Sequence, residues 1–189
     1  QYALYEMPDG YNTRSRQFGV TGNVNYTYAG KYYVDLSYRV DGNSTYGSDK
    51  KYAPFWSTGI GWNLHNEKVL KRNKIVNMLR LKASYGETGA ASGAQETDAY
   101  TYYQYISDNR YMNWMGAQLG GLGNLNLSWQ TTKEMNVGVE FGVLDNRIKG
   151  SFEYYTKATN NLLSSMDLPL AMGFASYRAN VGEVENNGW

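Results

Sequence analysis

Few residues in this sequence could carry out covalent or acid–base chemistry. Among its 189 residues there is no cysteine and only one histidine, His65. The lack of cysteine excludes disulfides, thiol nucleophiles, zinc ribbons and iron–sulfur clusters. A single histidine also excludes every metal motif built on a histidine pair. His65 comes at the end of an alternating run, which favours a solvated turn residue over a catalytic one.

The carboxylates provide two further candidates. Glu183 and Glu185 would share one face of an extended segment, as a catalytic carboxylate pair requires, but an ordinary strand explains them equally simply. The run from Asp41 begins like a calcium loop, yet Thr45 and Tyr52 stand where an acid or amide and a bidentate glutamate are needed. The sequence therefore predicts no enzyme, no metal site and no cofactor.

Charge and composition narrow the class of protein further. The 18 Lys and Arg nearly balance the 17 Asp and Glu, for a formal net charge of +1. Such a balance argues against nucleic-acid binding, because little positive charge is left to neutralise phosphates. The 21 glycines and 19 tyrosines are typical of β-structure with tight turns.

Strict alternation of apolar and polar residues is the strongest structural signal, and period two indicates strands. Six runs show it: 17–28, 32–41, 56–65, 79–86, 134–143 and 148–157. Ten charged residues lie on the polar positions of these runs and none on the apolar ones: Asp35, Arg39, Asp41, Arg80, Lys82, Glu134, Glu140, Lys149, Glu153 and Lys157. A seventh strand is expected from about Val181.

Two architectures produce this alternation, a soluble sandwich and an outer-membrane barrel. Runs of about ten residues suit strands that cross a bilayer, and sandwich strands are shorter. Tyrosine and tryptophan near the run ends suit a lipid–water boundary. The connections also alternate between short and long, as in outer-membrane barrels, with the middle short connection, 65–77, as the exception. We expect a short helix at 66–72 and a loop over 111–132, whose glycines and amides exclude a membrane-spanning helix.

Seven strands do not obviously close a barrel, and open sheet edges in hydrocarbon are costly. We therefore expect residues 1–189 to be part of a larger barrel domain, with the remaining strands elsewhere. The polar positions would then face the barrel interior. Their mixed signs predict no strong ion selectivity.

Several ordered segments resemble the C-terminal barrel of the SusC/RagA family of TonB-dependent outer-membrane transporters. The segments that carry the resemblance are 22–28, 31–33, 37–44, 51–57, 61–62, 79–89, 127–134, 145–148 and 180–188. The resemblance implies an antiparallel transmembrane β-barrel of 22 strands in the outer membrane of a Gram-negative bacterium, with an N-terminal plug. It also implies import of oligosaccharides or peptides with TonB-supplied energy, and a SusD-like surface lipoprotein as a lid. No plug or TonB-binding segment is recognisable in 1–189.

The long connection 87–128 is the best candidate for substrate contact, because flat aromatic rings stack on sugars and acids or amides bind hydroxyls. The candidates are Tyr100, Tyr103, Tyr105, Asp108, Tyr111 and Trp114. These rings could instead pack loops together or meet the lid. Two other functions stay open at the sequence level, a soluble carbohydrate-binding β-sandwich and a small structural or adhesive outer-membrane barrel.

Overall fold

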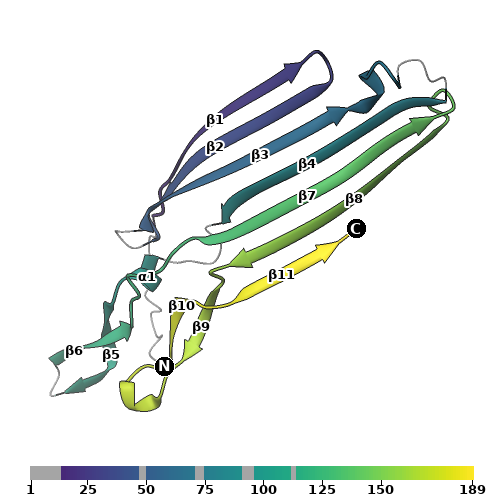
Figure 1. Cartoon of the computed structure of the whole chain (residues 1–189). Helices are drawn as coiled ribbons and strands as arrows, with labels where there is room; N and C mark the ends of the chain where they lie inside the picture. Colours follow the sequence, from purple (N-terminus) through teal and green to yellow (C-terminus); the bar gives the residue numbers. More distant parts are fainter. Residues whose placement is uncertain (1–13, 47–49, 71–74, 91–95, 112–113) are drawn as a thin grey trace, which may run out of the picture.

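The computed structural model describes residues 14–46, 50–70, 75–90, 96–111 and 114–189, without the side chains of 96, 97 and 104–115. The described residues form strands joined by turns and a few short helical segments (Figure 1). The elements are β1 (Gln17–Tyr28), β2 (Tyr32–Asn43), β3 (Tyr52–Asn63), the 3₁₀ helix η2 (Leu64–Asn66), β4 (Val76–Ala90), α1 (Glu96–Ala99), β5 (Tyr102–Tyr111), β6 (Trp114–Gly121), β7 (Gln130–Val143), β8 (Ile148–Asn160), β9 (Leu163–Asp167), the 3₁₀ helix η3 (Leu170–Met172), β10 (Ser176–Asn180) and β11 (Glu183–Gly188).

Seven of the strands form one antiparallel sheet in the order β1-β2-β3-β4-β7-β8-β11. Five of the six alternating runs lie wholly in this sheet, and the expected seventh strand is β11. The run 56–65 lies in β3 only as far as Asn63, and its last two residues belong to η2. The structure lengthens several runs at the end where the long connections lie, so that β7, for example, begins at Gln130. The predicted antiparallel sheet of long strands is therefore confirmed.

The two ends of the sheet differ in their connections. At one end, β1 and β2 are joined by the three residues 29–31, of which Ala29 and Gly30 have positive φ, and Lys31 N–H donates to the Tyr28 carbonyl at 2.9 Å. Such a turn matches the twist of the strands that it joins. At the other end, two hairpins project beyond the sheet, β5–β6 and β9–β10 (Figure 1). Short connections, 29–31 and 144–147, thus lie at the end opposite the hairpins, but the β3–β4 connection at the same end, 64–75, is longer and is the exception that the sequence already indicated.

Two local expectations are wrong. The segment 111–132 is not one loop, because it holds β6 and the start of β7. Glycines hide the alternation of β6, since the Tyr102 ring lies against Gly120 and Gly121 and leaves no room for a side chain there. No helix begins at Asn66 in the part of 66–72 that is described. The 3₁₀ helix lies earlier, at Leu64–Asn66, where the Glu67 N–H bonds the Leu64 carbonyl.

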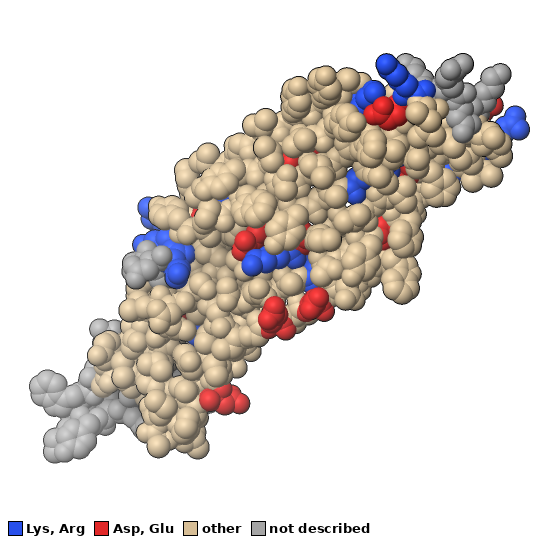
Figure 2. Space-filling view, in the orientation of Figure 1, with Lys and Arg blue, Asp and Glu red and all other residues tan. Residues whose placement is uncertain are grey.

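The sheet keeps the two faces that the alternation predicted. The polar face carries all ten charged residues of the alternating runs. The apolar face exposes large side chains on β1, β2, β3, β4, β7 and β8, among them Val24, Leu36, Ile60, Val137 and Phe152. Figure 2 shows a broad face on which charged side chains are sparse along most of the length of the strands. A continuous exposed apolar surface of this size is a mark of contact with lipid or protein.

Aromatic pairs lie across neighbouring strands of the apolar face. Tyr32 and Trp62 stack near the short-turn end, with ring centroids 5.9 Å apart, and Trp56 and Tyr85 meet at 5.6 Å further along. Beyond this second pair, the extended strands carry the first charges of the apolar face, at the paired residues Glu87 and Lys133. Rings followed by charges are what a lipid–water boundary requires.

Hydrophobic side chains gather in one cluster at the end of the sheet where the long connections lie. This rim core consists of Tyr46, Phe55, Leu127 and Trp129, which are 0–5% exposed, with Ala53 and Leu163 packed against it. The Trp129 ring lies 5.0 Å from that of Tyr46 and 5.8 Å from that of Phe55. Burial raises the pKa of the Tyr46 hydroxyl.

Hydrogen bonds extend the rim core to all three long connections. Trp129 Nε1 donates to the Lys50 carbonyl at 3.0 Å, in the β2–β3 connection. The Ser128 N–H donates to Asn180 Oδ1, and Asn180 Nδ2 donates back to the Ser128 carbonyl, both at 2.8 Å. Asn180 is the last residue of β10. These bonds therefore attach the β9–β10 hairpin to the segment just before β7.

The arrangement does not fit a soluble sandwich. Within the described ranges, the seven-stranded sheet has no second sheet packed on either face, because the other two sheets are the projecting hairpins. Over the same ranges, we find no helix with the length and hydropathy needed to cross a membrane.

Candidate functional site on the polar face

The polar face carries a network of charged side chains toward the short-turn end. Lys82 Nζ lies 3.3 Å from Glu140 Oε1 and 3.5 Å from Glu153 Oε1, joining β4 to β7 and β8. Arg80 reaches the same carboxylate of Glu140 at 3.6 Å and donates from Nε to Asn63 Oδ1 at 2.8 Å. These contacts balance the charges locally, as the mixed signs of the sequence predicted.

A second ion pair lies toward the long-connection end. Arg39 Nε donates to Asp41 Oδ1 at 2.6 Å, and Asp41 is buried. The cations of both networks therefore already have carboxylate partners. Between the two networks the side chains are mostly small or neutral.

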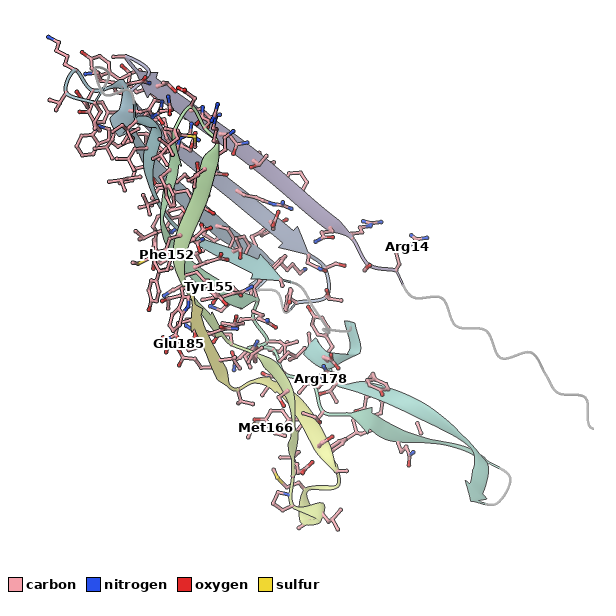
Figure 3. The ribbon with its side chains drawn as sticks, turned by 90° about the vertical axis from the view of Figure 1, so that its right-hand side faces the viewer. Arg14, Phe152, Tyr155, Met166, Arg178 and Glu185 are labelled. Carbon is pink, nitrogen blue, oxygen red and sulfur yellow. The ribbon has the colours of Figure 1, made fainter. Side chains whose placement is uncertain are left out.

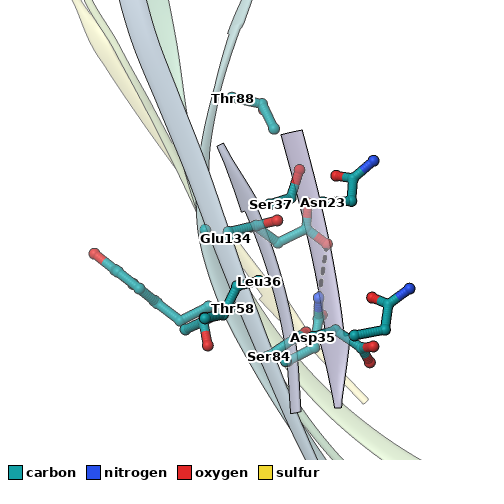
Figure 4. A pocket seen from close by; sticks show the side chains of 14 residues that line it. Asn23, Asp35, Leu36, Ser37, Thr58, Ser84, Thr88 and Glu134 are labelled. Atoms are coloured by element: carbon teal, nitrogen blue, oxygen red, sulfur yellow. Dashed lines mark hydrogen bonds between the residues drawn. The ribbon is translucent and has the colours of Figure 1, made fainter. Parts of the chain in front are cut away.

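This middle zone forms an open hollow of about 540 Å³ on the polar face, which we call the wall hollow. Five strands line it: β1, β2, β3, β4 and β7. Its lining residues are Asn23, Asn25, Asp35, Leu36, Ser37, Ser57, Thr58, Gly59, Ser84, Tyr85, Gly86, Thr88, Glu134 and Asn136. Figure 4 shows Asn23, Asp35, Ser37 and Glu134 around it. The volume lies within the range of small-molecule sites.

The floor of the wall hollow is low because two adjacent strands place glycine opposite serine twice. Ser57 pairs with Gly86, and Gly59 pairs with Ser84. Neither glycine projects a side chain, so the polar face is lowest here. The serines leave hydroxyl groups on an otherwise bare floor.

Two amide–carboxylate pairs form opposite walls. On β7, Asn136 Nδ2 donates to Glu134 Oε1 at 3.0 Å (Figure 4). On the other side, with its amide nitrogen facing Asp35, Asn25 donates to Asp35 Oδ1 at 2.9 Å. Each wall thus presents a donor beside an acceptor, and each carboxylate keeps a second oxygen for another donor.

A second hollow, of about 230 Å³, adjoins the first toward the rim core. The two share Ser37, Ser57 and Thr88 in their linings. The second is also lined by Arg39, Asp41 and the rings of Phe55 and Trp129. The polar face therefore offers a continuous depression from the rim core to the middle of the strands.

The residues predicted for substrate contact lie elsewhere, in and before the β5–β6 hairpin. Figure 3 shows this hairpin diverging from β9–β10 beyond the end of the sheet. Tyr100 and Tyr103 are exposed, at 41% and 74%. The side chains of Tyr105, Asp108, Tyr111 and Trp114 lie outside what is described, although the hairpin backbone pairs Tyr111 with Trp114. Direct contact with substrate stays a prediction.

The other chemical candidates have structural partners. His65 is half-buried, and its Nδ1 lies 3.1 Å from the Leu79 carbonyl oxygen. The Asn43 side chain accepts from the Thr45 N–H at 2.9 Å, which is a local turn. Glu183 and Glu185 lie in β11, opposite Asn160 and Ala158, so they share one face of a strand.

The sequence reasoning missed the wall hollow. Its uncharged residues stand on polar positions of the alternating runs, where no site was predicted because they carry no charge: Asn23, Asn25, Ser57, Ser84 and Asn136. One signal was available: glycine stands on polar positions of two neighbouring runs, at Gly59 and Gly86. That these glycines fall side by side depends on the register between β3 and β4.

The fold and the polar face together define a class of protein. A single sheet of long strands, with lipid-compatible side chains outside and ion pairs inside, is a wall segment of an outer-membrane β-barrel. The chain belongs to the TonB-dependent receptor family, because the family model described as "TonB dependent receptor-like, beta-barrel" matches residues 2–189.

Individual relatives agree with this family. The chain is 36% identical to TonB-dependent receptor P3 of Formosa agariphila over 99% of its length, and 30% identical to TonB-dependent receptor SusC of Bacteroides thetaiotaomicron over 94%. Among solved structures, the RagAB peptide transporter matches 92% of the chain with a TM-score of 0.82 and 29% identity. The expected resemblance to the SusC/RagA family and the outer-membrane location are confirmed.

A more distant structure shows the same fold. The siderophore receptor PirA from Pseudomonas aeruginosa matches 92% of the chain with a TM-score of 0.59 and 14% identity. The chain spans about a fifth of the length of the relatives: 19% of receptor P3, 18% of SusC and 19% of the RagAB chain.

Proposed function

We propose that residues 1–189 form part of the barrel domain of an active importer in the outer membrane. The full protein would take up oligosaccharides or peptides with energy supplied through TonB, and would catalyse no reaction. A SusD-like surface lipoprotein would act as its lid. The barrel itself would have the 22 strands that the sequence resemblance implies.

One observation carries this proposal beyond the family. The polar face holds a continuous, hydrogen-bonding depression between two balanced ion networks, from Arg39–Asp41 to Lys82–Glu140. A solute that passes along this face would meet donors and acceptors and no strong net charge. A wall that only anchored or adhered would need no such lining.

The names of two similar proteins support the same proposal. RagAB is named as a peptide transporter, and SusC is named as a TonB-dependent receptor. The two hairpins of this chain project from the end of the sheet that is extracellular in such barrels. They are therefore suitably placed to meet a surface lid.

The test is uptake by cells that carry the full-length protein. Deletion of its gene should abolish growth on one class of oligosaccharide or peptide, and dissipation of the proton gradient should have the same effect. Surface attachment without uptake would contradict the proposal and favour an adhesive barrel.

The hairpin can be tested separately. Trp114→Ala should lower uptake while the receptor still assembles in the outer membrane, because an aromatic face contributes about 1 kcal/mol or more to a stacked contact. Assembly is measured by the heat-dependent shift of the folded barrel on gels. Unchanged uptake would remove Trp114 from the substrate path, and Tyr103→Ala provides the comparison at an exposed ring of the same hairpin.

A further inference from the structure

We propose that the wall hollow is a binding subsite for an uncharged carbohydrate segment, and that it discriminates against acidic glycans. This inference rests on the proposed import function and names the chemistry that the barrel wall would select. It depends on the lining of the hollow and on the charges around it.

The hydrogen-bonding groups of the hollow suit hydroxyls that both donate and accept. Each wall combines a carboxylate with an amide, Asp35 with Asn25 and Glu134 with Asn136. A vicinal pair of sugar hydroxyls can donate to the carboxylate and accept from the amide at the same time. The serines of the floor add hydroxyls of the same kind.

The charges of the hollow argue against an anionic ligand. Its lining contains two acids and no lysine or arginine. In the rows on either side of the hollow, Lys82 contacts Glu140 and Glu153, and Arg39 contacts Asp41. Lys157 pairs with Glu134 across β7 and β8 on the same face and balances that one acid. A uronate or sulfate in the hollow would face one negative charge in excess, on the side of Asp35, which disfavours it electrostatically.

The adjoining hollow supports a chain-like ligand. Phe55 and Trp129 line it next to the shared residues Ser37 and Ser57. Both rings are only 4–5% exposed because they pack in the rim core, so the polar groups of Ser37, Ser57 and Thr88, which line both hollows, are the groups that would contact the ligand along this stretch. An oligosaccharide could therefore extend from the rim core into the wall hollow without leaving the polar face.

The floor offers a variant that fills the hollow with little strain. A Cβ on Gly59 would lie 3.7 Å from Asp35 Cβ and 3.8 Å from Asp35 Oδ2, which is ordinary contact. Gly59→Leu should thus occupy the hollow and leave the strand intact. Gly22 is the matched control, because it also lies in the sheet, on the apolar face, and a Cβ there would meet nothing within 4 Å.

The experiment measures binding to the full-length receptor purified in detergent. The probes are hexasaccharides from a neutral glucan, mannan and galactan, hexagalacturonate as the acidic glycan, and an uncharged hexapeptide. We expect at least one neutral hexasaccharide to bind, with hexagalacturonate weaker. Gly59→Leu should lower the affinity for that neutral probe about tenfold or more, and Gly22→Leu should not change it.

Charge-removing variants test the discrimination itself. Asp35→Asn together with Glu134→Gln should lower the preference for neutral over acidic probe about tenfold, because the repulsion of the uronate is lost. An unchanged preference would overturn the electrostatic part of the inference. Binding of the peptide alone, abolished by Gly59→Leu, would overturn the assignment to carbohydrate.

Import by cells separates this inference from the function on which it rests. If uptake depends on the receptor and Gly59→Leu behaves as wild type in binding and uptake, the subsite is wrong and the importer stands. If deletion of the receptor changes the uptake of none of the probes or of any tested nutrient, the importer itself is wrong.

Discussion

The seven-stranded sheet and the rim core are stabilised in different ways, although they share strands. All twelve residues of β1 are exposed, and the apolar face presents side chains such as Phe18, Ile60 and Phe152 with more than half of their surface free. In the rim core, Leu127 is 0% exposed and Trp129 is 4% exposed. The sheet relies on lipid to cover its apolar side chains, whereas the rim covers its own.

The difference follows from the two environments that the chain contacts, the hydrocarbon of the bilayer and the water outside it. In hydrocarbon, strands need paired backbone groups and apolar outer side chains, and no internal core is required. Outside the bilayer, loops in water must bury apolar surface to stay ordered. Trp129 lies just before β7 begins at Gln130. The chain therefore passes from the rim core to the lipid-facing sheet within a few residues.

The largest expected effect separates the rim from the sheet. Trp129→Ala removes the ring that contacts both Tyr46 and Phe55, and such a loss in a packed core costs about 3–5 kcal/mol. The cost should fall on the long connections. Hydrogen exchange of the full receptor should become faster in the β2–β3 connection and in the β9–β10 hairpin, and should stay unchanged in β1 and β2.

Trp62→Ala is the control, because Trp62 lies on the apolar face near the other end of the sheet. It should leave exchange in the long connections as in wild type. If Trp129→Ala instead lowers the melting temperature of the whole barrel and exchange rises throughout the sheet, the rim is not a separate core.

A charge on the apolar face should have the next largest effect. Phe152→Lys places an ammonium group where the sheet contacts lipid, which costs about 2–4 kcal/mol near the middle of the bilayer. The amount of receptor assembled in the outer membrane should fall. Ser151→Lys is the matched variant, because Ser151 is the adjacent residue on the polar face and pairs with Glu140. Equal loss for both variants would contradict the assignment of the two faces.

The smallest effect concerns the short-turn end, which is covered by neither lipid nor the rim core. Lys31 Nζ lies 2.8 Å from Glu67 Oε2, and the Tyr32 hydroxyl also donates to Glu67. The hydrogen bond from Lys31 is the main cause that lowers the pKa of Glu67, and the same bond raises the pKa of Lys31.

The sign of the pH dependence follows. The carboxylate of Glu67 stabilises the folded turn above the ordinary pKa of glutamate, and this contribution disappears as the pH falls through the lowered pKa. The contribution of Lys31 is complete below the ordinary pKa of lysine and is lost as the pH rises through its raised pKa. Glu67→Gln should therefore flatten the acid side of the melting-temperature profile slightly. An acid side as steep as that of wild type would show that the pair does not stabilise the turn.

Much of the sheet was predictable because each strand carries its own pattern. The run from Gln17 to Tyr28 coincides with β1, since alternation on both faces leaves only one way to separate polar from apolar positions. The turns at 29–31 and 145–146 were predictable for the same reason, as they interrupt the pattern. The hairpin β5–β6 was not, because its glycines hide the alternation.

The sequence alone determined the long antiparallel strands, their two faces, the lipid-compatible outer surface and the family resemblance, because alternation and residue type are local properties. Only the tertiary structure decided the rim core and the wall hollow. Tyr46, Phe55 and Trp129 come from three separate segments, and Gly59 and Gly86 adjoin Ser84 and Ser57 only through strand register. Such sites depend on which residues lie opposite one another, and no single segment contains that information.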